Sequence, residues 1–344
     1  MISHSRPWIE TTDLKAVENS LASETIAKGK IVKQFESSLV NFVGENQKAI
    51  SCNNGTSALQ LALLSLGLEL GDEVVLPTYV CSSVMQAVYA VGAKPVLCDI
   101  GENWNLTVES VRQAITPKTK VIIIVHIFGI TANVSDFKQF KIPIVEDCCQ
   151  AFGALDHGKN VGTLGDIAVF SFHATKCFTT GEGGAVLTDS EEYFSKLIEI
   201  QEQGQVVSKL SDMQASLGLS QLERYSKFLE RRLQMAERYC RELPEDIVLS
   251  MRALLGQGNI FFRFLVSVSK VDDRDIDFFS EKGIAVRRGV DTLLHRLNGE
   301  LDNKYPNAVA KYQTTLSLPI YPALSDDEQS VIIREMNAYF ENML

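Results

Sequence analysis

The chain has 344 residues, of which 45% are hydrophobic and 22% charged, and its formal net charge is −10. These values are ordinary for a soluble globular protein, and the length predicts about two domains. The acidic balance disfavours nucleic-acid binding, which needs a basic face, although the local field of a pocket can still attract an anionic ligand.

No targeting segment, membrane segment or metal site is expected. The N-terminal MISHSRPWIE lacks the charged-then-apolar pattern of a signal peptide. The longest apolar run, VIIIV at 121–125, is far too short to span a bilayer. The seven cysteines are an odd number without a CxxC pair, and the five histidines are scattered without ligand spacing. This pattern indicates reduced thiols in a cytoplasmic protein and no zinc site.

The first two thirds of the chain alternate short β-branched runs with helical patterns. The predicted strands cover residues 48–52, 73–77, 94–99, 120–127, 142–147, 166–172 and 184–189. The predicted helices cover residues 56–68, 81–92, 107–115 and 190–204. Buried runs separated by helices are typical of an α/β fold with a mostly parallel sheet.

The last third of the chain has a different order of elements. A long helical zone at 214–243 carries apolar residues at helical spacing with charges between them, and we interpret it as a connector. The elements predicted after it are a strand at 259–269, a helix, glycine stop and strand within 272–289, and a closing helix at 326–343. We therefore expect a large α/β domain over 1–240, with an N-terminal arm and the connector, and a smaller α+β domain over 241–344.

Polar residues follow several of the predicted strands. Gly55 and Thr56 open a helix, Asp147 ends a buried run, and Ser171 and Lys176 come with the next one. Ligands of open α/β sheets bind beyond the carboxyl ends of the strands, so these groups should meet at one edge. Backbone N–H groups at a helix start suit a phosphate. A lysine forms a Schiff base with a carbonyl cofactor, and pyridoxal phosphate works best when a carboxylate keeps its ring nitrogen protonated.

Taken singly, each of these residues favours a simpler interpretation. A lysine after a strand is usually a solvated surface residue. Asp147 alone would be a strand-end cap, Gly55 and Thr56 a plain helix start, and Ser171 a locally bonded hydroxyl. Only the combination predicts a pyridoxal-phosphate site.

Longer stretches carry a resemblance to a known family. They include NNGTSALQLALLSLGLELGDEVVLPTY at 53–79, VEDCCQAFGA at 145–154, FSFHATKCFTTGEGG at 170–184 and LSLPIYPALSDDE at 316–328. Over nearly its whole length the chain resembles the DegT/StrS-type sugar aminotransferases, a branch of the fold-type-I pyridoxal-phosphate enzymes in the aspartate aminotransferase superfamily. The pairing of EDxxQ with SFHxTKxxTTGEGG is the most specific part. The resemblance implies a seven-stranded, mostly parallel sheet between helices.

The resemblance also implies the roles of individual residues. Lys176 would form the Schiff base with pyridoxal phosphate and then move protons between substrate and cofactor. Asp147 would pair with the ring nitrogen, and Gln150 would sit near the phenolic oxygen of the ring. The residues implied for the phosphate are Gly55, Thr56, Ser57 and Ser171.

For two further positions, a role in binding is implied but a purely structural role is an alternative. His173 would lie beside the ring or the sugar, unless it is a buried structural histidine. Glu182 would lie near the substrate, unless it is a plain hairpin carboxylate. Many relatives place an aromatic residue over the cofactor ring where this chain has Cys81, and Tyr79, two residues away, is a candidate for cofactor contact.

Two segments depart from the family pattern. Relatives have a longer loop whose asparagine reaches the neighbouring subunit's cofactor phosphate, whereas this chain has only QVVSKL at 205–210. Val207 falls at the place of that asparagine, and either the contact is absent or Ser208 or Lys209 supplies it. The second segment, at 283–297, matches a sugar-side or dimer-side motif with shifted spacing and no proline. Its candidate substrate-binding residues are Arg287, Arg288 and His295, with solvated or interface arginines as the alternative.

The resemblance implies transamination, because family dehydratases replace the lysine by histidine. The implied acceptor is a keto sugar, usually a nucleotide-linked 4-keto-6-deoxy sugar, and the implied donor is glutamate or glutamine. Pyridoxamine phosphate would form in between, and the active site would be shared in a homodimer. Two alternatives remain open: a keto-cyclitol or another cyclic ketone as acceptor, and a non-catalytic relative that binds pyridoxal phosphate or a nucleotide sugar.

Overall fold

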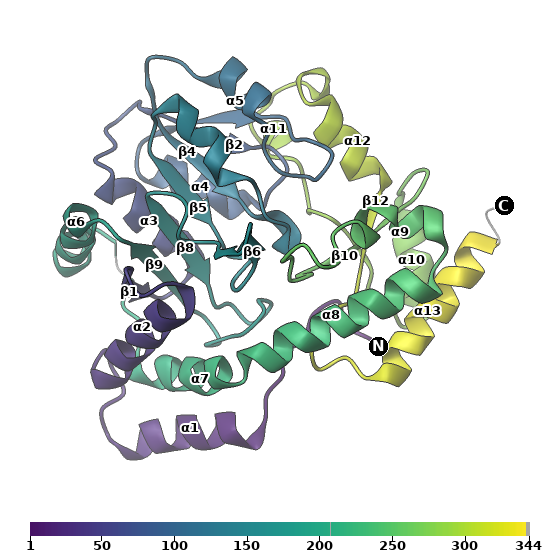
Figure 1. The fold of residues 1–344 in the computed structure, drawn as a ribbon, viewed down its shortest axis with the longest axis horizontal. Helices are drawn as coiled ribbons and strands as arrows, with labels where there is room; N and C mark the ends of the chain where they lie inside the picture. Colours follow the sequence, from purple (N-terminus) through teal and green to yellow (C-terminus); the bar gives the residue numbers. More distant parts are fainter. Residues whose placement is uncertain (207, 342–344) are drawn as a thin grey trace.

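The computed structural model describes residues 1–206 and 208–341. Its centre is a seven-stranded sheet in the order β1-β9-β8-β5-β4-β2-β3 (Figure 1). The strands are β1 Lys48–Cys52, β2 Glu73–Pro77, β3 Lys94–Cys98, β4 Thr119–Val125, β5 Ile144–Asp147, β8 Ile167–Ser171 and β9 Gly184–Thr188. All seven were predicted, and the α/β class is confirmed. Only β9 runs against its neighbours β1 and β8; the other ladders are parallel.

The sheet is buried on both faces, which explains its continuous β-branched runs. Successive residues of a strand point to opposite faces. In β4, Val121 and Ile123 belong to the hydrophobic cluster on one face, and Ile122 and Ile124 belong to the cluster on the other. The predicted helices form within a few residues of the expected bounds, as α3 Gly55–Ser65, α4 Ser82–Ala90, α5 Val108–Ala114 and α6 Glu191–Glu202.

Two N-terminal helices, α1 Thr11–Ala22 and α2 Lys30–Val43, pack on the side of the connector. The helical zone predicted over 214–243 forms as two helices, α7 Asp212–Glu223 and α8 Tyr225–Glu242. The break is at Arg224, whose guanidinium forms ion pairs with Glu10 and with the buried Asp13 of α1. A tertiary ion pair therefore accompanies the end of the first connector helix.

The last third of the chain is built around a three-stranded antiparallel sheet, β10-β12-β11. Its elements are α9 Glu245–Arg252, β10 Phe264–Ser267, α10 Asp273–Glu281, β11 Arg287–Arg288, α11 Leu294–Leu297, α12 Pro306–Thr314, β12 Thr315–Leu318 and α13 Asp326–Glu341. The short elements of the chain are η1 Ile127–Gly129, η2 Val134–Phe140, β6 Leu155–Asp156, β7 Lys159–Asn160 and η3 Asp302–Lys304.

The strand predicted at 259–269 is wrong in its first half, because β10 begins only at Phe264. Residues 259–263 instead cross to the large sheet. The Asn259 Oδ1 accepts a hydrogen bond from the Thr131 N–H, and the Ile260 N–H donates to the Gly129 carbonyl. This segment therefore links the two sheets.

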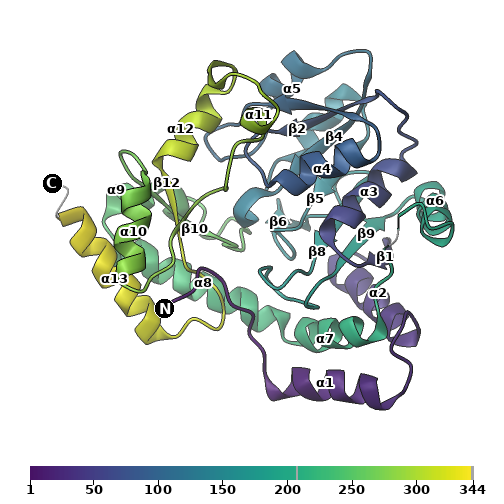
Figure 2. The same cartoon turned by 180° about the vertical axis from the view of Figure 1, so that it is seen from behind.

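The division of the chain at residue 240 stays a prediction. The long helix α8 runs from the large sheet toward the small one and lies along α13 (Figures 1 and 2). Its Arg232 donates to the Ile320 carbonyl, and its Tyr239 hydroxyl donates to the Pro319 carbonyl. These contacts tie the second half of the connector to the smaller sheet.

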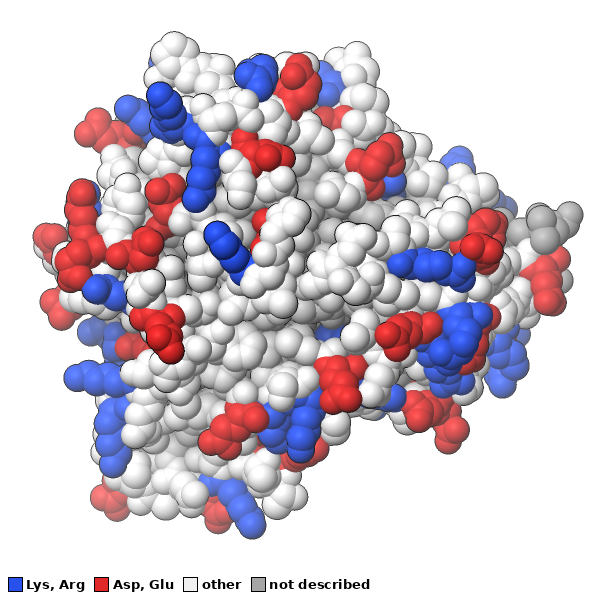
Figure 3. All heavy atoms as spheres, in the orientation of Figure 1, with Lys and Arg blue, Asp and Glu red and all other residues white. Residues whose placement is uncertain are grey.

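Acidic and basic side chains are interspersed over the described part of the face seen in Figure 3. Among the helices of residues 1–206 and 208–341, none combines the length and the apolar character that a bilayer crossing requires.

Candidate active site

A cavity of about 270 Å³ opens at the carboxyl ends of the central strands. Its walls include seven of the residues singled out from the sequence, namely Gly55, Thr56, Asp147, Ser171, His173, Lys176 and Glu182. They come from the start of α3, the end of β5, the end of β8 and the loop after it. The position agrees with the rule for ligand sites of open α/β sheets.

The start of α3 is pressed against the end of β8. Asn54 caps the helix, since its Oδ1 accepts a hydrogen bond from the Ser57 N–H at 2.8 Å. A Cβ on Gly55 would lie 2.8 Å from the Ser171 Cβ, so only glycine fits there without a shift. The first N–H groups of a helix have no intrahelical partner and attract anions. This end of α3, with Ser171 beside it, therefore suits a phosphate; Ser57 itself is buried and does not line the cavity.

Asp147 is the last residue of β5 and is 4% exposed. Its Oδ1 accepts a hydrogen bond from the Cys149 N–H at 3.0 Å. The carboxylate borders the cavity, where it can meet a protonated ring nitrogen. The carboxylate is thus suited to the pyridinium of a bound cofactor.

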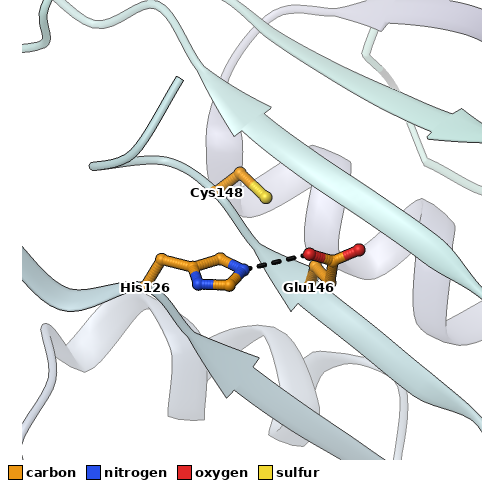
Figure 4. Close-up of side chains that lie close together, drawn as sticks. All are labelled: His126, Glu146 and Cys148. Carbon is orange, nitrogen blue, oxygen red and sulfur yellow. Dashed lines mark hydrogen bonds and ion pairs between the residues drawn. The ribbon is translucent and has the colours of Figure 1, made fainter. Parts of the chain in front are cut away.

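The neighbouring Glu146 is fully buried and, because successive residues of a strand alternate, points to the opposite face of β5. Figure 4 shows its side chain beside those of His126 and Cys148. Its two oxygens accept hydrogen bonds from four donors: His126 Nε2 and the backbone N–H groups of Gly162, Leu164 and Gly165. Burial alone would raise the pKa of Glu146, but the bonds from His126, Gly162 and Gly165 hold it below its ordinary value.

The His126, Glu146 and Cys148 side chains have their potential metal-binding atoms within 4.8 Å of one another. The Nδ1 of His126 accepts a hydrogen bond from the Ala132 N–H, so its proton is on Nε2, which faces Glu146. Both ring nitrogens and both carboxylate oxygens are therefore engaged within the protein. This cluster anchors β5 directly behind Asp147.

Lys176 lies in the loop after β8, half-buried in the cavity wall, with its Nζ 5.4 Å from the centroid of the Phe262 ring. The loop is held by its own hydrogen bonds. The Thr179 hydroxyl donates to the Phe172 carbonyl, and the Thr180 hydroxyl donates to the Glu182 carbonyl. A Cβ on Gly183 would lie 2.1 Å from the Thr180 Oγ1, which explains the glycine. The threonine and glycine run thus makes a stable platform for the lysine.

His173 and Glu182 meet at the wall of the cavity. The Nε2 of His173 lies 3.4 Å from a Glu182 carboxylate oxygen, and its Nδ1 lies 2.8 Å from the Thr175 hydroxyl. His173 is half-buried and Glu182 exposed. Their roles toward cofactor or substrate stay predictions.

Gln150 and Tyr79 do not line the cavity. The Gln150 Oε1 accepts a hydrogen bond from the Phe128 N–H at 2.8 Å. Tyr79 is fully buried, and its hydroxyl, which has no hydrogen-bond partner within the described part of the chain, points toward Gly289. Burial raises the pKa of this phenol. Their proposed contacts with the cofactor stay predictions.

The three residues predicted for the sugar are not brought into this cavity. Arg287 is exposed on β11. Arg288 donates to the carbonyls of Tyr312 and Val271. His295 is fully buried; its ring nitrogens lie 2.8 Å from the Thr78 hydroxyl and 2.9 Å from an Asp302 oxygen. The bonds of His295 give it a place in the packing of the chain, and a role toward the sugar stays a prediction.

In the short segment at 205–210, Val207 lies outside the described residues. Ser208 is buried beside the β1–α3 turn, where its carbonyl accepts a hydrogen bond from the Asn53 N–H. Lys209 is exposed.

Seven residues that line the cavity were not proposed from the sequence as binding residues: Asn54, Leu59, Cys81, Ser83, Val84, Cys149 and Thr175. An asparagine directly before Gly-Thr-Ser is a helix-capping signal that indicates Asn54. Cys149 has no comparable signal. Burial, and then Asp147, raise the pKa of its thiol well above the ordinary value, so it stays protonated.

The sequence pattern of the DegT/DnrJ/EryC1/StrS aminotransferase family matches residues 7–337. The GDP-perosamine synthase of Escherichia coli O157:H7 is 29% identical over 98% of both chains. The dTDP-4-dehydro-2,3,6-trideoxy-D-glucose 4-aminotransferase of Saccharopolyspora spinosa is 29% identical over 99% of this chain and 97% of its own. Among solved structures, the putative sugar aminotransferase Spr1654 from Streptococcus pneumoniae, in its PMP form, superposes with a TM-score of 0.90 at 26% identity over the full length of both chains; the same protein is also known in a PLP form.

Proposed function

The chain belongs to the DegT/DnrJ/EryC1/StrS aminotransferase family and is a pyridoxal-phosphate-dependent transaminase, and from this premise we propose that it aminates a keto sugar. The donor would be glutamate or glutamine. The acceptor would be a nucleotide-linked 4-keto-6-deoxy sugar. The observation that carries this proposal is that one cavity holds the Lys176 amine, the Asp147 carboxylate and the N-terminus of α3.

The residues present fit pyridoxal phosphate. When bound, this cofactor supplies an electron sink for the carbon that loses or gains a proton. Gly55, Thr56 and Ser171 would hold its phosphate, because Gly55 leaves the start of α3 open to an anion. Asp147, supported from behind by the Glu146 cluster, would keep the ring nitrogen protonated.

Lys176 would be the covalent anchor and the base. Its Nζ has no carboxylate within 4.0 Å among the described residues, so the amine is not held in an ion pair. Because Lys176 and Asp147 face the same cavity, the lysine can carry a proton to and from a substrate carbon there.

The choice of acceptor is supported by the names of relatives. One is a GDP-perosamine synthase and another acts on a dTDP-4-dehydro-trideoxy sugar. Both are similar to this chain along its whole length. A keto-cyclitol is the second candidate acceptor.

We also propose a homodimer with a shared active site and a smaller domain from residue 241.

The direct test follows the amino nitrogen. The cofactor-loaded protein is incubated with ¹⁵N-glutamate and, separately, with GDP-linked and dTDP-linked 4-keto-6-deoxy sugars and a keto-cyclitol, and products are read by mass spectrometry. The proposal predicts ¹⁵N in an amino sugar. Label only in the cyclitol product would favour the second acceptor, and glutamate that keeps its nitrogen with every acceptor would contradict amine transfer from this donor.

A further inference from the structure

Arg263, directly before β10, is a largely buried cation without a carboxylate partner. Within residues 1–206 and 208–341, its Nε is buried without a hydrogen-bond partner and its guanidinium has no carboxylate oxygen within 4.0 Å. Burial, and then Arg287, lower its pKa to about 10, although Asp291 raises it in part, so the guanidinium is still charged at neutral pH. A buried charge without an opposite charge is costly, so this guanidinium is poised to receive an anion.

The register of the small sheet places a second arginine on the same face. Ser317 of β12 lies opposite both Leu265 of β10 and Arg287 of β11. Residues directly opposite each other in neighbouring strands point to the same face of a sheet, so Arg287 shares the face of Ser317. Arg263 reaches that face through His4, whose Nε2 contacts both the Ser317 hydroxyl and the Arg263 Nη1, and Arg287 lowers the pKa of Arg263.

His4, in the N-terminal segment, contacts the guanidinium of Arg263. That segment is tied to the small domain by hydrogen bonds of Ile2 with Gly283 and Ala285, and it runs next to α8 (Figure 2). The His4 Nε2 lies 3.0 Å from the Ser317 hydroxyl and 3.3 Å from the Arg263 Nη1. A guanidinium only donates, so Nε2 accepts and His4 is neutral; burial and both arginines lower its pKa to about 3. His4 therefore positions Arg263 without neutralising it.

Arg263 lies close to the active-site cavity. Its Cζ is 5.9 Å and the Lys176 Nζ is 5.4 Å from the centroid of the same Phe262 ring. The two cations are thus separated by no more than the sum of these distances, which is within the length of a small substrate.

The backbone around Arg263 is strained. Phe261 and Phe128 have φ of 50° and 61°, a region that bulky side chains rarely adopt. The Arg263 N–H donates to the Phe128 carbonyl, which joins the two strained segments. Such strain persists where the surrounding structure enforces it, and it clusters at functional sites.

We propose that Arg263, with Arg287 on the same face of the small sheet, forms an anion-binding subsite for a substrate of this enzyme. A planar guanidinium binds carboxylates and phosphates through two parallel hydrogen bonds. Two groups offer that chemistry: the side-chain carboxylate of a dicarboxylic amino donor, and the diphosphate of a nucleotide sugar. The inference rests on the proposed function, which puts the reacting atom of the substrate near Lys176.

The test is a calorimetric titration of the cofactor-loaded protein with unreactive probes. Glutarate represents the donor carboxylate, and GDP and dTDP represent the diphosphate. The proteins are the wild type, Arg263→Gln, Arg263→Lys and the control Arg241→Gln, which changes an exposed arginine of α8. We expect the wild type and the control to bind one class of probe, Arg263→Gln to bind it at least tenfold more weakly, and Arg263→Lys to recover only part of the loss.

Each outcome of the titration either assigns the subsite to one class of substrate or overturns the proposal. A loss confined to glutarate assigns the subsite to the donor, and a loss confined to the nucleotides assigns it to the sugar diphosphate. Equal binding by the wild type and Arg263→Gln, or no binding of either probe by the wild type, overturns the proposal. Arg287→Gln, at an exposed position, provides a variant that should fold even if Arg263→Gln does not, and a loss of about threefold is expected for it.

Failure of the subsite and failure of the proposed function are separable. A wild type that binds the probes through Arg263 but moves no amine from glutamate would overturn the function and leave the subsite. If the wild type and Arg263→Gln make an amino sugar with equal efficiency and bind the probes equally, the subsite is overturned and the proposed function stands.

Discussion

Glu146 and Asp147 are neighbours in β5 whose carboxylates serve opposite faces of the sheet. The Glu146 side chain is enclosed by four donors, while Asp147 borders the cavity. The alternation of a β-strand produces this division. The first carboxylate anchors the strand, and the second is left for chemistry.

Replacing Glu146 by glutamine should destabilise the protein. Each oxygen of Glu146 accepts two hydrogen bonds, from His126 and Gly162 on one side and from Leu164 and Gly165 on the other. An amide NH₂ would therefore face two donors in either orientation. We expect the free energy of unfolding to fall by about 1–3 kcal/mol or more, measured by urea denaturation at pH 7. An unchanged midpoint would contradict this account.

The same carboxylate should contribute to acid sensitivity. Since the folded state holds the pKa of Glu146 below its ordinary value of 4.5, its stabilisation is complete above that value and is lost as the pH falls through the folded pKa. Unfolding free energies of the wild type and Glu146→Gln measured from pH 7 to pH 3 should converge toward the acid end. A constant difference over this range would exclude the linkage.

The Asp13–Arg224 contact should stabilise the junction between α1 and the connector. Asp13 is 1% exposed and also accepts hydrogen bonds from Ser220 and Gln221. Asp13→Ala leaves Arg224 with Glu10 as its remaining carboxylate and removes the acceptor of the Ser220 and Gln221 side chains, and we expect a loss of about 1–3 kcal/mol or more. Glu10→Ala, which removes the more exposed partner of the same arginine, is the control and should cost no more than about 1 kcal/mol. Equal losses for the two variants would refute the distinction.

Gly55→Ala should weaken cofactor binding. The new Cβ would lie 2.8 Å from the Ser171 Cβ and would push the start of α3 away from β8. We expect the dissociation constant for pyridoxal phosphate to rise about tenfold, measured by absorbance titration. Gly44→Ala meets a methyl group of Thr163 at 3.1 Å, outside the residues that line the cavity, and should leave that constant unchanged. If Gly44→Ala raised the dissociation constant as much as Gly55→Ala or more, the weaker cofactor binding would reflect lower stability and not the contact with Ser171.

Asp147→Asn should lower turnover more than cofactor affinity. The amide keeps the size of the side chain but removes the charge that favours a protonated ring nitrogen. We expect the rate of amine transfer to fall at least about a hundredfold, measured in single turnovers at saturating cofactor. A variant with wild-type turnover would mean that Asp147 does not contact the ring.

The seven strands could be predicted because each is a short β-branched run buried on both faces, bounded by turn residues. The α2 helix was missed although Val32, Phe35, Leu39 and Val43 repeat at helical spacing and are all buried. The break at Arg224 could not be predicted, since it accompanies an ion pair with a helix 211 residues away.

The candidate site was also predictable only in part, because local sequence patterns place some of its residues and contacts between distant segments place the others. Gly55, Asp147, Ser171 and Lys176 follow strands or open a helix, so local patterns place them at one edge of the sheet. Arg263 has no such pattern. Its position depends on the backbone at Phe261 and on contacts with the N-terminal segment, and neither can be read from neighbouring residues.

The most direct test of the whole account is the chemical identity of the residue that carries the cofactor. The protein is loaded with pyridoxal phosphate, reduced with borohydride, digested and sequenced by mass spectrometry, with and without prior addition of L-glutamate. The account predicts a pyridoxyl group on Lys176 of the untreated protein, its loss after glutamate, and no modified peptide in Lys176→Ala. A pyridoxyl group on another lysine, or one that glutamate leaves in place, would contradict it.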